Sequence, residues 1–162
     1  MKITYDSISS EYLYPLSKAD VVQLKKVLPS EYLNKIRNIK FGCNTKTTQE
    51  GRIVQHGRYY DIRINFCLNN LRSLILSNEK TYIEQIKKFG GIIDFNYRFV
   101  RWKLPNAKRY ALYLLLHEIG HLIFSENYTD EKLQGDSSKT EEQWCDKYAM
   151  GKLQEILLVE PY

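Results

Sequence analysis

The stretch that decides the fold is AKRYALYLLLHEIGHLIFS, residues 107–125. Its apolar residues recur at intervals of three and four positions, the spacing of one side of an α-helix, and Pro105 marks the start of that helix. His117, Glu118 and His121 follow one another inside it in the pattern HExxH. Residues four apart on a helix lie about 40° apart around its axis, so both imidazoles project from one side and can share a metal ion.

The HExxH pattern is typical of a catalytic zinc site. Neutral imidazole is a common zinc ligand. Zinc lowers the pKa of a bound water molecule, and Glu118 is placed to take the proton of that water. The alternative is a pair of ordinary histidines on a half-buried helix. That alternative leaves Gly120 unexplained, because glycine destabilises a helix interior by about 1 kcal/mol relative to alanine. We therefore expect one Zn²⁺ per chain, bound by His117 and His121.

A third protein ligand is needed, because catalytic zinc sites have three, with water in the fourth position. No histidine follows His121 in the sequence. We expect Glu142 to be the third ligand. Asp146 lies one turn further along the same helix face, where it can accept the other N–H of a ligand histidine and fix its orientation. Glu141 points about 100° away from Glu142, and complementing the helix dipole is a sufficient role for it.

The alternatives to Glu142 as third ligand are Cys145 and the acidic residues of 126–136. A polar loop over 126–137 leads to the last helix. Thr140 and the Glu-Glu-Gln that follows it have the form of a capping box, which predicts that this helix begins at Thr140.

The two motifs together resemble the ImmA/IrrE-like metallopeptidases, which are compact gluzincins. Their signature is HE-apolar-GH followed by a helix reading Glu-x-x-Ala-Asn/Asp-x-Phe-Ala. Residues 142–149 read EQWCDKYA, with Cys145 in place of the small Ala and Tyr148 in place of Phe. The segment DIRIN, residues 61–65, is similar to the strand upstream of the family's helix. Residues 66–105 form a longer connection than is usual there, and the family's Leu-Met-Pro run is absent.

This resemblance implies a zincin-like fold in which His117, His121 and Glu142 bind zinc and Glu118 is the general base. The implied reaction is hydrolysis of a peptide bond in a specific intracellular protein, such as a repressor or regulator, often in a phage or mobile element. It also implies that the peptide lies extended along a sheet edge formed by residues 58–66. The candidates for a further donor to the oxyanion are His56, Tyr59, Tyr128 and Tyr148.

The remaining periodicity predicts an α+β domain over residues 1–162, in which a small twisted sheet packs against the HExxH helix and the C-terminal ligand-bearing helix. Apolar spacing, caps and turn residues predict the other elements. They are helices over 17–28, 30–36 and 70–89, and strands over 39–43, 52–56, 58–66 (after a turn at Gly57) and 92–102.

The cysteines and the apolar runs predict a cytoplasmic protein. Cys43, Cys67 and Cys145 form no CxxC pair and leave an odd count, which is typical of free thiols in the cytosol. The longest apolar run, residues 111–116, is far shorter than the roughly 20 residues of a membrane span. The first residues, MKITYD, lack the apolar core of a signal peptide.

Charge is distributed unevenly along the chain. Residues 1–126 carry 20 basic and 11 acidic side chains, whereas residues 127–162 carry 4 basic and 8 acidic ones. The basic excess is either ordinary solvated surface or a surface for nucleic acid. It motivates the alternative to an enzyme, a non-enzymatic zincin-like regulator that binds a protein partner or nucleic acid.

Overall fold

The computed structural model describes residues 1–43, 49–128 and 137–159. It has the α+β architecture that the sequence predicts, with a mixed sheet, an antiparallel sheet and helices. In the mixed sheet β1, β3 and β5 run parallel, and β4 is antiparallel to β5 and forms one edge. In the order in which they lie in the sheet, these strands are β1 (Lys2–Tyr5), β3 (Ile36–Gly42), β5 (Tyr59–Asn65) and β4 (Gly51–His56).

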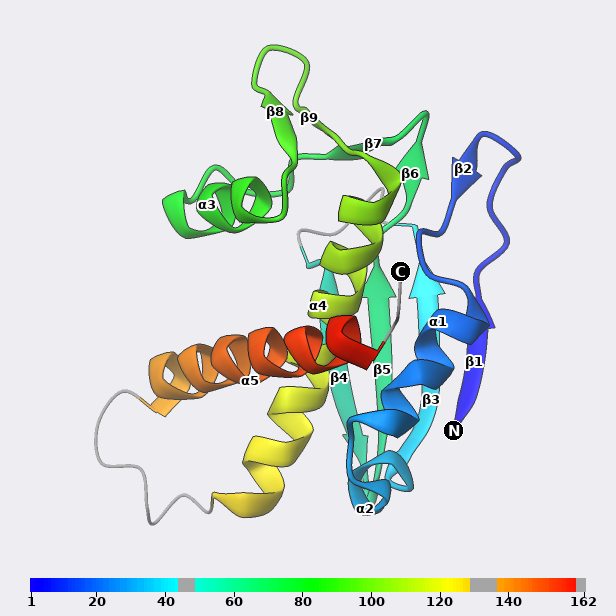
Figure 1. Ribbon diagram of the computed structural model, residues 1–162, viewed down its shortest axis with the longest axis vertical. Coiled ribbons are helices and arrows are strands. Elements are labelled where there is room, and N and C mark those ends of the chain that lie inside the picture. The colour runs from blue at the N-terminus through cyan, green and yellow to red at the C-terminus, as the bar shows by residue number, and fades with distance from the viewer. Residues whose placement is uncertain (44–48, 129–136, 160–162) are drawn as a thin grey trace.

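Alternation along the strands gives the mixed sheet one buried face. In β5, Tyr60, Ile62 and Ile64 are buried, as the sequence predicts. β3 begins three residues earlier than expected, because the preceding helix α2 (Ser30–Leu33) is a single turn. Figure 1 shows α1 (Lys18–Val22), the 3₁₀ segment η1 (Gln23–Lys26) and α2 on the same side of this sheet as the long helices.

Two long helices lie on the side of the buried face, and α4 is the one that packs on the strands. α4 (Leu104–Asn127) packs against β4 and β5, and α5 (Ser137–Val159) lies across α4 (Figure 1). α4 contains the predicted helix over 107–125. α5 begins three residues before Thr140, so the prediction that Thr140 is its N-cap was wrong. In the described part of the chain, no helix has both the length and the apolar content that crossing a membrane requires.

The antiparallel sheet overturns two predictions. The helix expected over 70–89 is limited to α3 (Lys80–Lys88), and the strand expected over 92–102 is a hairpin. Leu71, expected on the helix, lies instead in a tight turn between two short strands. In the order in which they lie in the sheet, its strands are β2 (Tyr12–Leu13), β6 (Leu68–Asn69), β7 (Arg72–Leu74), β9 (Phe99–Arg101) and β8 (Ile92–Asp94).

A disulfide joins Cys43, just after β3, to Cys67, just before β6, with the two Cα atoms 5.1 Å apart. The prediction of free thiols was wrong for these two residues, and Cys145 alone is free and buried. An odd cysteine count does not exclude one disulfide. Because disulfides are rare in the cytosol, the cysteines no longer support a cytosolic location.

Candidate metal centre

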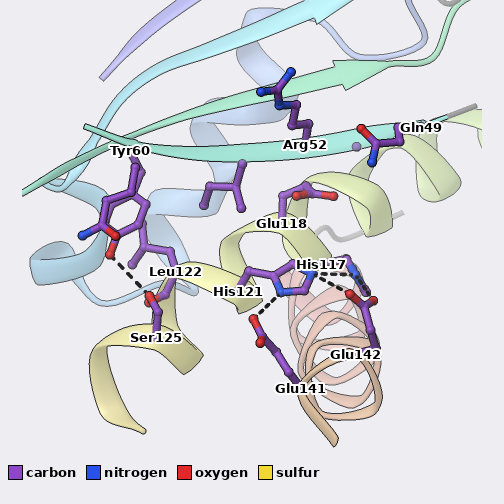
Figure 2. A pocket seen from close by; sticks show the side chains of 13 residues that line it. Gln49, Arg52, Tyr60, His117, Glu118, His121, Leu122, Ser125, Glu141 and Glu142 are labelled. Atoms are coloured by element: carbon purple, nitrogen blue, oxygen red, sulfur yellow. Dashed lines mark hydrogen bonds and ion pairs between the residues drawn. The ribbon is translucent and has the colours of Figure 1, made fainter. Parts of the chain in front are cut away.

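α4 presents its histidines where it meets α5 and β4 (Figure 2). Gly120 lies at the crossing of the two helices, and a Cβ atom added to it would come within 3.2 Å of the Cα and Cβ atoms of Cys145. The absence of a side chain at Gly120 therefore lets α5 approach closely enough for its carboxylates to reach α4. The thiol of Cys145 packs into this crossing, so it does not serve as the third ligand.

Three side chains direct donor atoms at one point. The Nε2 atoms of His117 and His121 are 3.2 Å apart. Glu142 Oε2 lies 3.2 Å from His117 Nε2, and Glu142 Oε1 lies 3.4 Å from His121 Nε2. Ligand bonds of about 2.0–2.1 Å in a tetrahedral zinc site place neighbouring ligand atoms about 3.3 Å apart. The three side chains therefore form a group of donor atoms that could hold a metal ion.

The other ring nitrogen of each histidine contacts a carboxylate of α5. His117 Nδ1 lies 2.9 Å from Asp146 Oδ1, and His121 Nδ1 lies 2.7 Å from Glu141 Oε1. Each carboxylate accepts the Nδ1–H of its histidine and so leaves Nε2 as the atom that faces the shared point. The prediction for Asp146 agrees with this geometry. The assignment of Glu141 to the helix dipole alone was wrong, because Glu141 orients His121.

A tyrosine that the sequence did not single out supports this arrangement. Tyr113 lies one helical turn before His117 on α4, and its hydroxyl donates a hydrogen bond to Asp146. The spacing of four residues to His117 was the available signal, but only the position of α5 shows what the hydroxyl meets. Tyr113 thereby holds the Asp146 carboxylate, which in turn orients His117.

Electrostatics favours a cation at this point. Burial alone lowers the pKa of His117, but hydrogen bonds with Asp146 and Glu142 outweigh burial and raise that pKa to about 9. The hydrogen bond with His117 lowers the pKa of Glu142. At neutral pH this pKa keeps His117 protonated beside the carboxylates, and a divalent cation bound there would displace a proton.

Glu118 sits between the histidines and strand β4, and only 8% of its surface is exposed (Figure 2). Burial raises its pKa, an effect that the two neighbouring histidines partly offset. Its carboxylate passes over Gly51, the first residue of β4, where an added Cβ atom would lie 2.2 Å from Glu118 Oε1. The close approach of Glu118 to the strand therefore depends on a glycine at position 51.

A buried carboxyl group anchors the start of β4 to α4. Glu50 is 8% exposed and accepts hydrogen bonds from the hydroxyl groups of Tyr82 and Tyr110. Burial raises the pKa of Glu50 to about 7, although both hydrogen bonds lower it. Since Glu50 directly precedes Gly51, this contact places the strand against Glu118.

A pocket of about 520 Å³ runs along β4 past the histidines. The strand beside it is β4, the sheet edge, whereas β5 lies between β3 and β4. The expectation that residues 58–66 form the edge was therefore wrong by one strand. At one end of the pocket the Tyr60 hydroxyl lies 3.3 Å from Ser125 Oγ, and Arg52 points to the other side of the strand (Figure 2).

The four candidate oxyanion donors do not line this pocket. His56 lies 3.4 Å from Asp61, and Tyr128 stacks on Phe124. The Tyr148 hydroxyl is buried and has no hydrogen-bond partner among the described residues, and Tyr59 lies under the guanidinium of Arg58. Among the alternative acidic ligands in 126–136, Glu126 pairs with Lys35 instead, and the others fall within 129–136, outside the described residues.

Comparison of the chain with models of protein families, with curated proteins and with solved structures finds no match. What the site does is therefore inferred from its own residues and their geometry.

Proposed function

We propose that this protein is a zinc-dependent endopeptidase with a zincin-like fold. The observation that carries the proposal is the mutual spacing of 3.2–3.4 Å between donor atoms of His117, His121 and Glu142, with Glu118 beside them. Hydrogen bonds from both Nδ1 atoms to carboxylates add support, because this is the usual environment of histidines that bind metal. The resemblance of the two sequence motifs to ImmA/IrrE-like peptidases agrees with it.

In this proposal each residue has one task. Bound zinc would polarise the scissile carbonyl and make water acidic enough to be deprotonated near neutral pH. Glu118 takes the proton of the attacking water, and it can pass that proton to the leaving amine. Its buried position and raised pKa suit a group that both accepts and returns a proton. Asp146 and Glu141 hold the two imidazoles in place.

The substrate class follows from the edge strand. One side of β4 pairs with β5, and the other lies along the pocket. An extended peptide added there makes main-chain hydrogen bonds with the strand and crosses in front of Glu118. Ile53, Leu122 and Tyr60 give the pocket an apolar wall beside the polar Ser125. If the resemblance extends to the substrate, it is a repressor or regulator.

The test is Glu118→Gln, which removes the base and keeps the size of the side chain. Zinc-loaded parent protein is incubated with a proteome-derived peptide mixture, and new N-termini are identified by mass spectrometry. We expect new termini with the parent and none with Glu118→Gln, while both bind one zinc per chain. Glu84→Gln, an exposed substitution on α3, is the matched control and should cleave like the parent. Undiminished cleavage by Glu118→Gln would contradict the assignment.

A further inference from the structure

The antiparallel sheet lies at the top of Figure 1, and large side chains of β7, of β8 and of the turn between β8 and β9 are exposed on it. Strands β7, β9 and β8 pair so that Ser73 and Val100 point inward and are buried. The alternate positions of these strands point to the other side. Together with Tyr97, a turn residue whose ring stacks on Phe99, they form what we term the arginine–aromatic face. Its residues are Arg72, Leu74, Ile92, Asp94, Tyr97, Phe99 and Arg101.

Two arginines on this face are held side by side. Arg72 on β7 is directly opposite Arg101 on β9, and both are exposed. Within the described residues neither forms an ion pair with a carboxylate. The one acidic side chain on the face, Asp94, accepts a hydrogen bond from the backbone N–H of Tyr97. Like charges directly opposite each other destabilise a strand pair, so this arrangement favours an anion bound between them.

Flat aromatic surface lies next to the arginines. Tyr97 is 75% exposed and stacks on Phe99 with ring centroids 6.1 Å apart and planes 23° from parallel. The guanidinium of Arg72 lies 4.6 Å from the centre of the Phe99 ring. Tyr97 thus presents aromatic surface to solvent, and the ring on which it stacks also contacts the Arg72 guanidinium.

A pocket of about 340 Å³ continues the face at β7, where Arg72 and Leu74 also line it. Its lining also includes Asn69, Asn70, Tyr12 and the inward-pointing Ser73. Amide groups can donate to and accept from the edge of a nucleobase. The face therefore combines positive charge, a stacking surface and hydrogen-bonding groups.

We propose that the arginine–aromatic face binds single-stranded nucleic acid. Arg72 and Arg101 contact phosphate groups, and an unpaired base stacks on Tyr97. Proteins that bind single strands combine a positive surface with aromatic side chains in this way. The basic excess of residues 1–126 has the sign that such binding needs. The inference does not depend on the proposed peptidase activity, because the face contains none of the metal-site residues.

The test measures fluorescence anisotropy of a 5′-labelled dT20 oligonucleotide with the full chain at 50 mM salt. We expect binding that weakens steeply as salt is raised. Arg72→Ala with Arg101→Ala should lower affinity at least tenfold, and Tyr97→Ala should lower it about tenfold, whereas Tyr97→Phe should keep it. Lys25→Ala with Lys26→Ala, which removes two exposed charges from η1, is the matched control and should have little effect.

Three results would overturn the proposal. The first is no detectable binding at 50 mM salt. The second is an equal loss of affinity in the Lys25/Lys26 control, which would indicate general charge attraction. The third is binding to anionic phosphatidylserine vesicles that dT20 does not compete away, which would make the face a membrane surface. Adding a zinc chelator should leave oligonucleotide binding unchanged, so failure here is separable from failure of the peptidase proposal.

Discussion

Glu141 and Asp146 act as single residues in equivalent ways, each fixing one of the two histidines on α4. Their Oε1 and Oδ1 atoms lie 2.7 Å and 2.9 Å from the Nδ1 atoms of His121 and His117. Losing such a carboxylate typically lowers metal affinity or activity by 10- to 100-fold. Glu141, which was assigned to the helix dipole alone, therefore has the same role as Asp146: each orients one histidine.

We predict that Glu141→Ala and Asp146→Ala each weaken zinc binding by about 10- to 100-fold, measured by competition with a chromogenic chelator. Glu142→Ala should weaken it further, because two imidazoles remain as the protein ligands. Glu155→Ala, on the same helix but paired with Lys152, is the control and should bind zinc like the parent. Indistinguishable zinc affinities for Glu141→Ala and Glu155→Ala would refute the role of Glu141.

A second residue-scale prediction concerns Gly51. Gly51→Ala places a methyl group 2.2 Å from the present position of Glu118 Oε1, so the carboxylate must move away from the strand. We expect cleavage to fall at least tenfold while zinc stoichiometry stays at one, since a small displacement of a catalytic group has a large cost in rate. Gly151→Ala, in open space on α5, should keep activity and raise the melting temperature. Full activity of Gly51→Ala would show that Glu118 does not need this contact.

At the scale of elements, Glu50 joins β4 to α4 and makes their contact depend on pH. Its pKa is raised to about 7 in the folded state, against about 4.5 when unfolded. Well below pH 4.5 the Glu50 carboxyl is protonated in both the folded and the unfolded state, so its burial does not make stability depend on pH. Between pH 4.5 and 7 the unfolded chain loses its proton first, so the free energy of unfolding falls as pH rises.

We predict that Glu50→Gln abolishes the decrease in the free energy of unfolding between pH 4.5 and 7. The variant and the parent should have similar stability near pH 4, and the variant should gain up to about 3 kcal/mol relative to the parent by pH 8. Urea unfolding at a series of pH values measures the difference. A constant difference across that range would mean that Glu50 titrates normally in the folded protein.

Which elements could be predicted depended on how much of their structure was local. α4 and the β4–β5 hairpin carry their own periodicity and turn, and both agree with prediction. The β6–β7 hairpin turns at Asn70 and Leu71, with φ of 48° and 58°. Asparagine tolerates a positive φ but leucine rarely adopts one, so only the first of these two positions marked a turn. The spacing of Leu71 and Leu74 matched that of a helix instead.

For the molecule as a whole, the candidate site lies where three elements distant in sequence meet. The spacing within α4 was enough to predict His117, Glu118 and His121 as a group. Glu142 was predicted from the second motif. Gly51 was missed and Glu141 was assigned to the helix dipole alone, because their contacts exist only after β4 and α5 pack against α4. The same packing decides which strand forms the edge.

Zinc binding by His117, His121 and Glu142 can be tested with an anomalous difference map, recorded at the zinc absorption edge from crystals grown with one equivalent of Zn²⁺. We predict a single strong peak per chain, about 2.0–2.2 Å from His117 Nε2, His121 Nε2 and a carboxylate oxygen of Glu142. A peak bound by other side chains, or no peak between the two histidines, would contradict it.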